Sequence, residues 1–464
     1  MTKKIIWGVL NLFFIVVFFL ALWVLFFKKS GFDDEKIVAQ SQLKGKTFSA
    51  VPVELTLKNG LKAWFIKENS APLVAIDFYF DKTGYAFDDE GKEGLAVFAA
   101  SMLSKRAGDM DDETFQNLLN ENAIEIQVKA LDDIFEISLE TPKENLKTAA
   151  KILNDILIKP NTNENDAEVT KRKQITAIDM QKENPESVLG QQFKERLFRG
   201  HPKARLSFGK KEDVVTFLGQ DVKTFTDVHF KQNNLKTAIA GALSKDEAIS
   251  FLNVVFEGLQ QGENKKDLPP LMVHFEDKEE NIERDMPQVI SFFAAPGAKR
   301  LSEDFYPLYI ANEIFGGSGL TSRLNLHARE KEGLTYGIYT YLNTDNDAPR
   351  IVGMFSSSVQ NYEKMREILL DEWQKMAVSG VTKQEFEDIQ NNMLSAFHLR
   401  FSSLGHIAKQ LLFMQKENLG IDFFQKRNEY VANVSLEAVN AAAKKYFVNK
   451  PSILTIGNND NGEK

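Results

Sequence analysis

The residues of this sequence best suited to chemistry lie between Phe315 and Tyr336, where Arg329 and Tyr336 follow a glycine-rich run. An arginine guanidinium can hold a carbonyl or carboxylate through forked hydrogen bonds. A tyrosine phenol can donate a hydrogen bond to the oxyanion of a tetrahedral intermediate. The alternative is structural, since Arg329 could pair with Glu330 or Glu332 at the surface and Tyr336 could be a half-buried strand residue.

A second segment, which begins at Gly94-Leu95-Ala96, has the setting of a metal site without its ligands. It resembles the start of the zinc-binding helix in pitrilysin/insulinase-type peptidases, where His-x-x-Glu-His follows Gly-Leu-Ala. In that motif two histidines bind Zn²⁺ and the glutamate activates the bound water. The matching positions here are Val97, Ala100 and Ser101. Valine and alanine offer no lone pair, and a serine hydroxyl is a poor zinc ligand at neutral pH.

The resemblance also implies a third ligand, a glutamate on a later helix, and the best match by spacing is Ala177. All four positions of the expected zinc site therefore lack a metal-binding group, and we expect no metal or other cofactor in this chain. The six histidines offer no replacement, because no two of them lie three or four positions apart. Taken alone, the segment after Gly94 could also be only a buried helix.

The segment that contains Arg329 and Tyr336 resembles the carboxyl-terminal signature of the same family, in which an Arg and a Tyr at this spacing reach across a cleft to the peptide at the partner domain's zinc. The resemblance implies that these two residues bind substrate and transition state. It also implies that Gly316, Gly317 and Gly319 take part in substrate binding. Another match runs from Asn184-Pro185 to Gly209, and the resemblance covers nearly all of residues 49–460.

The family includes two-subunit enzymes, such as the mitochondrial processing peptidase, in which one subunit binds zinc and the other does not. The resemblance implies that this chain is a non-zinc subunit of a heterodimeric metallopeptidase, inactive by itself. The expected partners are a homologous zinc-bearing subunit with His-x-x-Glu-His and a peptide substrate. Two alternatives stay open: an inactive scaffold or assembly protein of the same fold, and a stand-alone peptidase with an unrecognised metal site.

Composition narrows the classes of protein. The net charge is −8, with 57 basic and 65 acidic residues and no long basic run, which argues against nucleic acid as a partner. The absence of cysteine excludes disulfides and thiolate metal sites. A chain of 464 residues with 43% hydrophobic residues is long enough for two folded domains.

The segment from Ile5 to Phe27 carries no charged residue and is long enough to span a bilayer as a helix. No small-x-small cleavage site follows it, so we expect an uncleaved transmembrane anchor rather than a signal peptide. Lysines flank both of its ends, so the flanking charge alone does not set the orientation. We expect a single-pass protein of the inner membrane with its body on the periplasmic or extracytoplasmic side.

The rest of the chain reads as one α+β module repeated. Strands with hairpin turns are followed by helices in the same order in each half, and Gly241 and Gly457 close equivalent strands. We predict two homologous antiparallel-sheet and helix sandwich domains that form a clamshell, preceded by the membrane helix. The predicted boundaries are an anchor at 5–27, a stalk at 28–48, an N-terminal domain at 49–260, a linker at 261–270 and a C-terminal domain at 271–460.

Overall fold

The computed structural model describes residues 51–262, 267–276, 278–345 and 347–458, which belong to one compact unit. The predicted membrane anchor at 5–27 and stalk at 28–48 lie outside these residues. Within the described ranges, no helix combines the length and the apolar character needed to cross a membrane.

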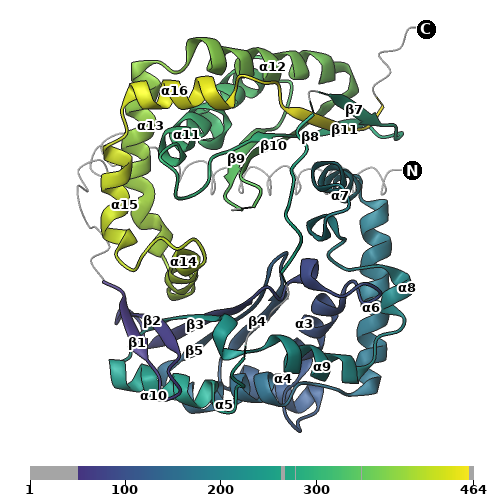
Figure 1. Ribbon diagram of the computed structural model, residues 1–464, viewed down its shortest axis with the longest axis vertical. Coiled ribbons are helices and arrows are strands. Elements are labelled where there is room, and N and C mark those ends of the chain that lie inside the picture. Colours follow the sequence, from purple (N-terminus) through teal and green to yellow (C-terminus); the bar gives the residue numbers. More distant parts are fainter. Residues whose placement is uncertain (1–50, 263–266, 277, 346, 459–464) are drawn as a thin grey trace, which may run out of the picture. The chain divides into compact units, whose positions relative to one another are not determined.

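The first half of the chain forms a six-stranded sheet with the order β1-β2-β6-β3-β5-β4 (Figure 1). Only β2 and β6 are parallel neighbours. The hairpin predicted at Lys58-Asn59-Gly60 joins β1 to β2, and Gly60 has a φ of 85° that favours glycine. The strands are β1 (Val53–Thr56), β2 (Lys62–Lys67), β3 (Leu73–Asp81), β4 (Glu125–Ala130), β5 (Ile134–Pro142) and β6 (Leu235–Gly241).

The second half forms a five-stranded sheet with the order β7-β11-β8-β10-β9, in which β7 and β11 are the parallel pair. Its order repeats that of the first sheet from β2 onward, so β2, β6, β3, β5 and β4 match β7, β11, β8, β10 and β9 in turn. The repeat inferred from the sequence is therefore present in the strand topology, and the α+β prediction is confirmed. The strands are β7 (Glu279–Ile282), β8 (Gln288–Pro296), β9 (Ile338–Asn343), β10 (Arg350–Ser358) and β11 (Ser452–Ile456).

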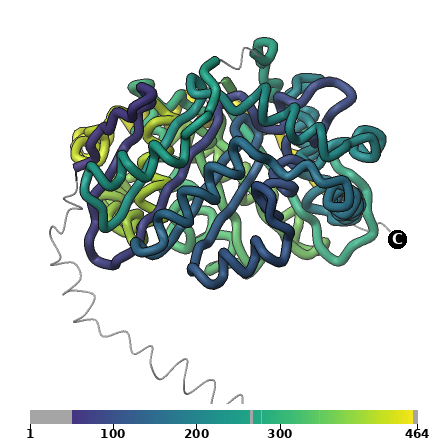
Figure 2. The backbone as a smooth tube through the Cα atoms, turned by 90° about the horizontal axis from the view of Figure 1, so that it is seen from below, coloured from purple at the N-terminus to yellow at the C-terminus, as the bar shows by residue number. Residues whose placement is uncertain are grey.

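Helices of the first half follow or separate these strands and pack largely on one face of the sheet. Figure 2, viewed from below, shows the blue and teal coils of this half in front of the green and yellow second half. The helices are α3 (Leu95–Lys105), α4 (Asp112–Glu121), α5 (Leu146–Ile158), α6 (Glu164–Glu183), α7 (Pro185–Phe198), α8 (Lys211–Val214), α9 (Gly219–His229) and α10 (Lys245–Val255).

The second half has a corresponding set, with two π-helical segments close to its glycine-rich run. The helices are α11 (Phe305–Asn312), the π-helix η5 (Glu313–Gly317), the 3₁₀ turn η6 (Gly319–Thr321), the π-helix η7 (Asn325–Lys331), α12 (Tyr362–Ser379), α13 (Lys383–Ala396), α14 (Leu404–Lys416), α15 (Phe423–Ala432) and α16 (Leu436–Tyr446).

One face of each sheet packs on helices of its own half. Val74, Ile76 and Phe78 of β3 point into a core shared with α3, α5 and α10. In the second sheet, Phe293 of β8 packs edge-on against Trp373 of α12, with ring centroids 6.3 Å apart. Successive side chains of a strand point to opposite faces of the sheet, so the apolar residues at every second position of β3 and β8 share this face.

The other face of each sheet is covered by a helix from the opposite half (Figure 1). Helix α7 of the first half packs on β8 and β11, where Leu189 and Phe193 join a core with Leu454 and Ile456. Helix α14 of the second half packs on β2, β3 and β6, and Gln415 donates a hydrogen bond of 2.9 Å to the carbonyl of Thr237. This exchange explains why the two repeats form one compact unit.

Lys203 adds a polar joint between the halves. Its side chain is only 4% exposed, and its Nζ lies 2.8 Å from Asp345 Oδ2, 3.3 Å from Asp133 and 3.4 Å from Asp347. Burial alone would lower the pKa of Lys203, but the carboxylates of Asp133 and Asp345 outweigh it and raise that pKa. The lysine is therefore held charged, and it ties the first half to the β9–β10 loop of the second.

Candidate functional site

The helix at the expected zinc position, α3, is firmly capped. The carboxylate of Asp88 accepts hydrogen bonds from the backbone N–H groups of Gly94 at 2.7 Å and Ala96 at 3.0 Å. These groups lack partners within the helix, and a negative charge at this end also favours the helix dipole. Gly94 has a φ of 94°, and an added Cβ would lie 2.5 Å from the carbonyl oxygen of Phe208. The packing and backbone conformation at the start of α3 therefore require glycine at position 94.

Helix α6 is bonded to the start of α3 by the buried amide of Gln174. Its Nε2 donates to the carbonyl oxygens of Gly94 at 3.0 Å and Phe208 at 2.8 Å. The neighbouring Gly209 approaches so closely that a Cβ would lie 1.9 Å from the carbonyl oxygen of Glu93. The two helices that would carry zinc ligands are thus held together although their ligands are missing.

The residues at the four zinc-site positions do not fit the metal. Val97 and Ala177 are partly exposed, Ala100 is buried and Ser101 is exposed, and none offers an imidazole or carboxylate. The hydroxyl of Ser101 is the single polar side chain among them. Zinc sites in proteins use Cys, His, Asp or Glu, so the residues at these four positions cannot hold the metal.

The glycine-rich run begins within the π-helix η5 and is followed by the π-helix η7, and such segments are frequent at functional sites. A Cβ on Gly316 would lie 2.6 Å from Thr340 Oγ1, and one on Gly317 would lie 2.8 Å from Glu313 Oε1. Gly319 has a φ of 64° with open space around it. Close packing and backbone conformation thus account for these glycines, and their substrate-binding role stays a prediction.

Asn325 fastens η7 to the start of β9. This fully buried side chain donates from Nδ2 to the carbonyl of Ile338 at 2.6 Å, and its Oδ1 accepts the N–H of Ile338 at 3.3 Å. Thr335 Oγ1 donates to the carbonyl of Ser356 at 2.7 Å and accepts the N–H of Gly337 at 3.1 Å. The backbone on both sides of Tyr336 is therefore fixed.

Arg329 and Tyr336 themselves have few internal partners. Tyr336 is 84% exposed, which contradicts the half-buried strand position considered as its structural alternative. Arg329 is 37% exposed, and its Nε lies 3.7 Å from the carboxylate of Glu330. That surface pair is the structural alternative considered for Arg329, and exposed pairs of this kind contribute little.

The nearby Arg323 has an internal role instead. Its guanidinium forms a two-pronged contact with Glu385, at 2.6 and 2.7 Å, and donates to the carbonyl of Gly380 at 3.0 Å. Burial opposes ionisation of Glu385, but the bonds from Arg323 and Thr382 outweigh it and lower the pKa of Glu385 to about 2. Arg323 therefore stabilises the fold, whereas the side chain of Arg329, which pairs with Glu330, is more exposed.

A cavity of about 970 Å³ lies between the halves. Asp133 and Lys203 line it from the first half, and Tyr341, Asp345 and Arg350 line it from the second. Charged side chains make up about half of its lining and apolar or aromatic ones most of the rest, so the cavity can contact both polar and apolar groups.

The histidines of the described ranges have local roles or lie at the surface. His327 Nδ1 lies 3.1 Å from Glu372, and His201 Nε2 lies 2.8 Å from the carbonyl of Pro269. Among the residues that the structure describes, no three His, Asp or Glu side chains gather into a possible metal site.

Sequence reasoning missed the residues that organise the site. Asp88 could have been found as a helix-capping residue, because an acidic residue shortly before a helix start is a known signal. Gln174, Asn325 and Lys203 could not, because each acts on a partner that is distant along the chain or on backbone atoms with no sequence signal of their own.

Comparison with known protein families gives two matches along the chain. The family described as Insulinase (Peptidase family M16) matches residues 65–210, and the one described as Peptidase M16 inactive domain matches residues 218–393. The two matches are adjacent, and they include most strands of both sheets but leave out β1 and β11.

Several individual proteins are similar over most of the chain. A Helicobacter pylori protein named Non-peptidase homolog YmxG is 26% identical over 359 residues, 77% of this chain and 82% of that protein. An uncharacterized zinc protease of Rickettsia felis is 24% identical over 421 residues, 87% of this chain and 97% of that protein. The solved structure of a peptidase M16 inactive domain from Pseudomonas fluorescens has a TM-score of 0.80 at 21% identity, with 88% of this chain and 97% of that chain covered.

Proposed function

We propose, on the premise that this chain is an inactive member of the insulinase peptidase family M16, that it is the non-zinc subunit of a heterodimeric metallopeptidase. In this role it supplies one wall of a peptide chamber and two substrate-binding side chains, Arg329 and Tyr336. The zinc and the catalytic base belong to a homologous partner with His-x-x-Glu-His.

The observation that carries this proposal is the exposure of Tyr336 on a fixed backbone. A large aromatic side chain that is 84% exposed gains little from folding, yet Thr335 and Asn325 hold the chain on either side of it through buried hydrogen bonds. A rigid loop that presents an unburied phenol is suited to contact with another molecule.

The roles of the two side chains follow from their chemistry. The guanidinium of Arg329 holds a carbonyl or carboxylate of the bound peptide with forked hydrogen bonds. The phenol of Tyr336 donates a hydrogen bond to the oxyanion of the tetrahedral intermediate formed in the partner's site. Neither role requires this chain to bind metal.

The proposal includes membrane attachment through residues 5–27, which lie outside the described residues. The apolar composition of that segment supports a single-pass anchor in the inner membrane, with the body on the periplasmic or extracytoplasmic side. A reporter fused to the carboxyl terminus tests this, and activity of a cytoplasm-specific reporter would reverse the orientation.

The function is tested by peptide cleavage with the chain paired with its zinc-bearing homologue. Tyr336→Phe should lower kcat by about 10²–10³-fold without changing assembly, because it removes one oxyanion donor. Arg329→Ala should lower kcat/KM and raise KM, because peptide and transition-state binding weaken together. Tyr339→Phe is the matched control, since Tyr339 is an exposed tyrosine of β9 at 47% exposure.

The competing function, an inactive scaffold, predicts a different result. A scaffold needs neither side chain, so both variants would assemble and cleave at the wild-type rate. That outcome would replace the proposed function with the scaffold. A pair that cleaves nothing even with both wild-type chains, although it assembles, would also favour the scaffold.

A further inference from the structure

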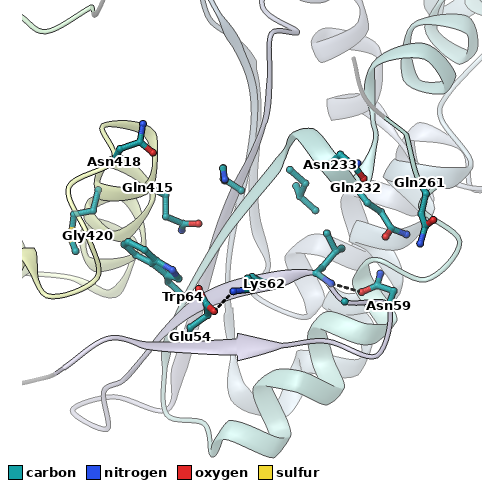
Figure 3. A pocket seen from close by; sticks show the side chains of 15 residues that line it. Glu54, Asn59, Lys62, Trp64, Gln232, Asn233, Gln261, Gln415, Asn418 and Gly420 are labelled. Carbon is teal, nitrogen blue, oxygen red and sulfur yellow. Dashed lines mark hydrogen bonds and ion pairs between the residues drawn. The ribbon is translucent and has the colours of Figure 1, made fainter. Parts of the chain in front are cut away.

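An open cavity of about 720 Å³ lies at the β1 end of the first sheet (Figure 3). It is at the opposite edge from β4 and from α3, the helix with the expected zinc positions. Strands β1, β2 and β6 and the carboxyl-terminal end of α14 contribute to its lining. We propose that this cavity is a binding site for a short oligosaccharide. This inference is independent of the proposed function, because none of its residues belongs to the Arg329 and Tyr336 region.

The first argument is the concentration of carboxamide side chains. The lining includes Asn59, Gln232, Asn233, Gln261, Gln415 and Asn418. Figure 3 shows two groups on opposite sides of the cavity, one with Gln232, Asn233 and Gln261 and the other with Gln415 and Asn418. Each carboxamide offers one acceptor and two donor hydrogens. A sugar hydroxyl, which both donates and accepts, can use either end of such a group.

Three of these amides have their orientation fixed by the protein. Gln232 donates from Nε2 to the carbonyl of Leu259 at 2.6 Å, and Gln415 donates from Nε2 to that of Thr237 at 2.9 Å. Asn59 Oδ1 accepts the N–H of Leu61 at 3.2 Å. The oxygens of Gln232 and Gln415 are thus left as acceptors, and the Nδ2 of Asn59 is left as a donor. A ligand must offer groups of both kinds.

The second argument is the combination of an aromatic ring with a nearly balanced charge. Trp64 of β2 is half-buried, and its indole lies beside Gln415 and Gly420 (Figure 3). Indole combines a flat apolar body with a polar N–H, which suits the C–H face and the hydroxyl edge of a sugar ring. Glu54 is paired with Lys62 at 2.6 Å, which leaves Lys236 as the one charged lining residue without an opposite charge in the lining. The ligand is therefore neutral or carries a single negative charge.

An extended peptide fits the cavity less well. Peptides bound along a sheet usually add a strand to a free edge through main-chain hydrogen bonds. The floor of this cavity includes β2 and β6, and each of these strands is already paired on both sides, while the edge strand β1 contributes only Glu54 to the described lining. Recognition over this floor must therefore come from side chains, and those present are mainly uncharged hydrogen-bonding groups.

The test uses the full-length chain in a detergent without a sugar headgroup, with N-acetylglucosamine trimer and maltotriose as probes. Saturable binding of at least one trimer, followed by calorimetry and tryptophan fluorescence, is expected. Trp64→Ala should weaken binding by roughly tenfold or more. Asn233→Ala should weaken it by about 2–10-fold. Trp64→Phe, which keeps a ring, should fall between wild type and Trp64→Ala.

The matched control is Gln384→Ala, an exposed amide of α13 that does not line the cavity, and it should bind as wild type does. Failure of both trimers to bind would overturn the proposal. Binding unchanged in Trp64→Phe and Asn233→Ala would do the same, even if Trp64→Ala does not fold. A capped tripeptide that binds with the same variant dependence, in place of the saccharides, would make the cavity a peptide site.

Discussion

The two halves of this protein share a strand order, apart from the additional β1 of the first half, but differ in the segments that resemble a peptidase site. In the first half, α3 is capped by Asp88 and joined to α6 by Gln174, and the positions that should bind zinc carry apolar or weakly polar side chains. In the second half, Asn325 and Thr335 hold a loop that presents Tyr336 to solvent. The local fold around the expected zinc site can thus be present without the metal ligands, because backbone packing and side-chain chemistry depend on different residues.

The faces covered by exchanged helices differ as well. Gly241 and Gly457 have φ values of 153° and 145° at equivalent strand ends, and by the register from them Asp77 of β3 corresponds to Phe292 of β8. Phe292 packs against Phe193 of α7, with ring centroids 6.3 Å apart. Asp77 is 1% exposed beneath α14, and no described group is hydrogen-bonded to its carboxyl oxygens. At this position the contact of α7 with the second sheet is apolar, whereas the contact of α14 with the first sheet contains a buried acid.

The largest expected effect would restore the lost zinc site. The combined change is Val97→His, Ala100→Glu, Ser101→His and Ala177→Glu. We expect about one Zn²⁺ per chain in this variant and no stoichiometric zinc in the wild type. Three protein ligands suffice for zinc, and α3 and α6 are already held together. Elemental analysis measures it, with the same variant lacking the Ala177 change as control. A folded four-residue variant without zinc would show that the helices no longer match the active geometry.

The next largest effect is expected on stability, when the contacts of Lys203 between the two halves are removed. Lys203→Met should destabilise the protein by about 3 kcal/mol, the lower end of the range for a broken buried pair, because Asp133 and Asp345 would be left as partly buried charges without Lys203. Denaturant unfolding measures the change. Lys426→Met is the control, since its pair with Asp422 is exposed and its loss should change stability much less. Equal effects would mean that helix exchange alone holds the halves.

The burial of Asp77 between β3 and α14 predicts that the stability of the protein depends on pH. Burial, followed by the charge of Glu136 on β5, raises the pKa of Asp77 from 3.8 to about 8, although Lys409 of α14 and Lys129 of β4 act to lower it. Between these values the folded state holds a proton that the unfolded state has released. The free energy of unfolding therefore falls as pH rises through this window, by up to about 1.4 kcal/mol per unit.

Asp77→Asn should remove this slope, because an amide does not ionise. Thermal or denaturant unfolding of wild type and variant between pH 4 and 8 should show a difference that grows in favour of the variant as pH rises. Asp246→Asn, an exposed change on α10, serves as the control. Parallel curves for wild type and Asp77→Asn would show that the carboxyl is ionised in the folded protein or reached by water.

The smallest effects separate two arginines of the second half. Arg323→Ala should cost about 1–3 kcal/mol, because Glu385 loses its two-pronged partner. Arg329→Ala should change stability by about 0.5 kcal/mol or less, because its pair with Glu330 is exposed. Melting temperatures of the isolated chain test this pair. A large loss for Arg329→Ala would make that residue structural and weaken its proposed role in substrate binding.

The sequence by itself determined the fold class, the repeat and the loss of the zinc ligands. These features are local: the alternation of apolar residues gives the strands, the turn at Lys58-Asn59-Gly60 gives the hairpin, and the residue types at Val97, Ala100 and Ser101 decide whether metal can bind. The family resemblance drawn from such motifs agrees with the two family matches. Each of these inferences needed only the side chains and their spacing.

The tertiary structure alone decided how the two repeats are joined and which polar groups are buried. The exchange of α7 and α14, the enclosure of Lys203 by carboxylates and the burial of Asp77 all depend on contacts between residues far apart in the chain. A charged residue has the same sequence signal whether it faces water or a packed helix, because burial is set by what folds over it. For the same reason, only the fold distinguished the exposed Arg329 from the internally bonded Arg323.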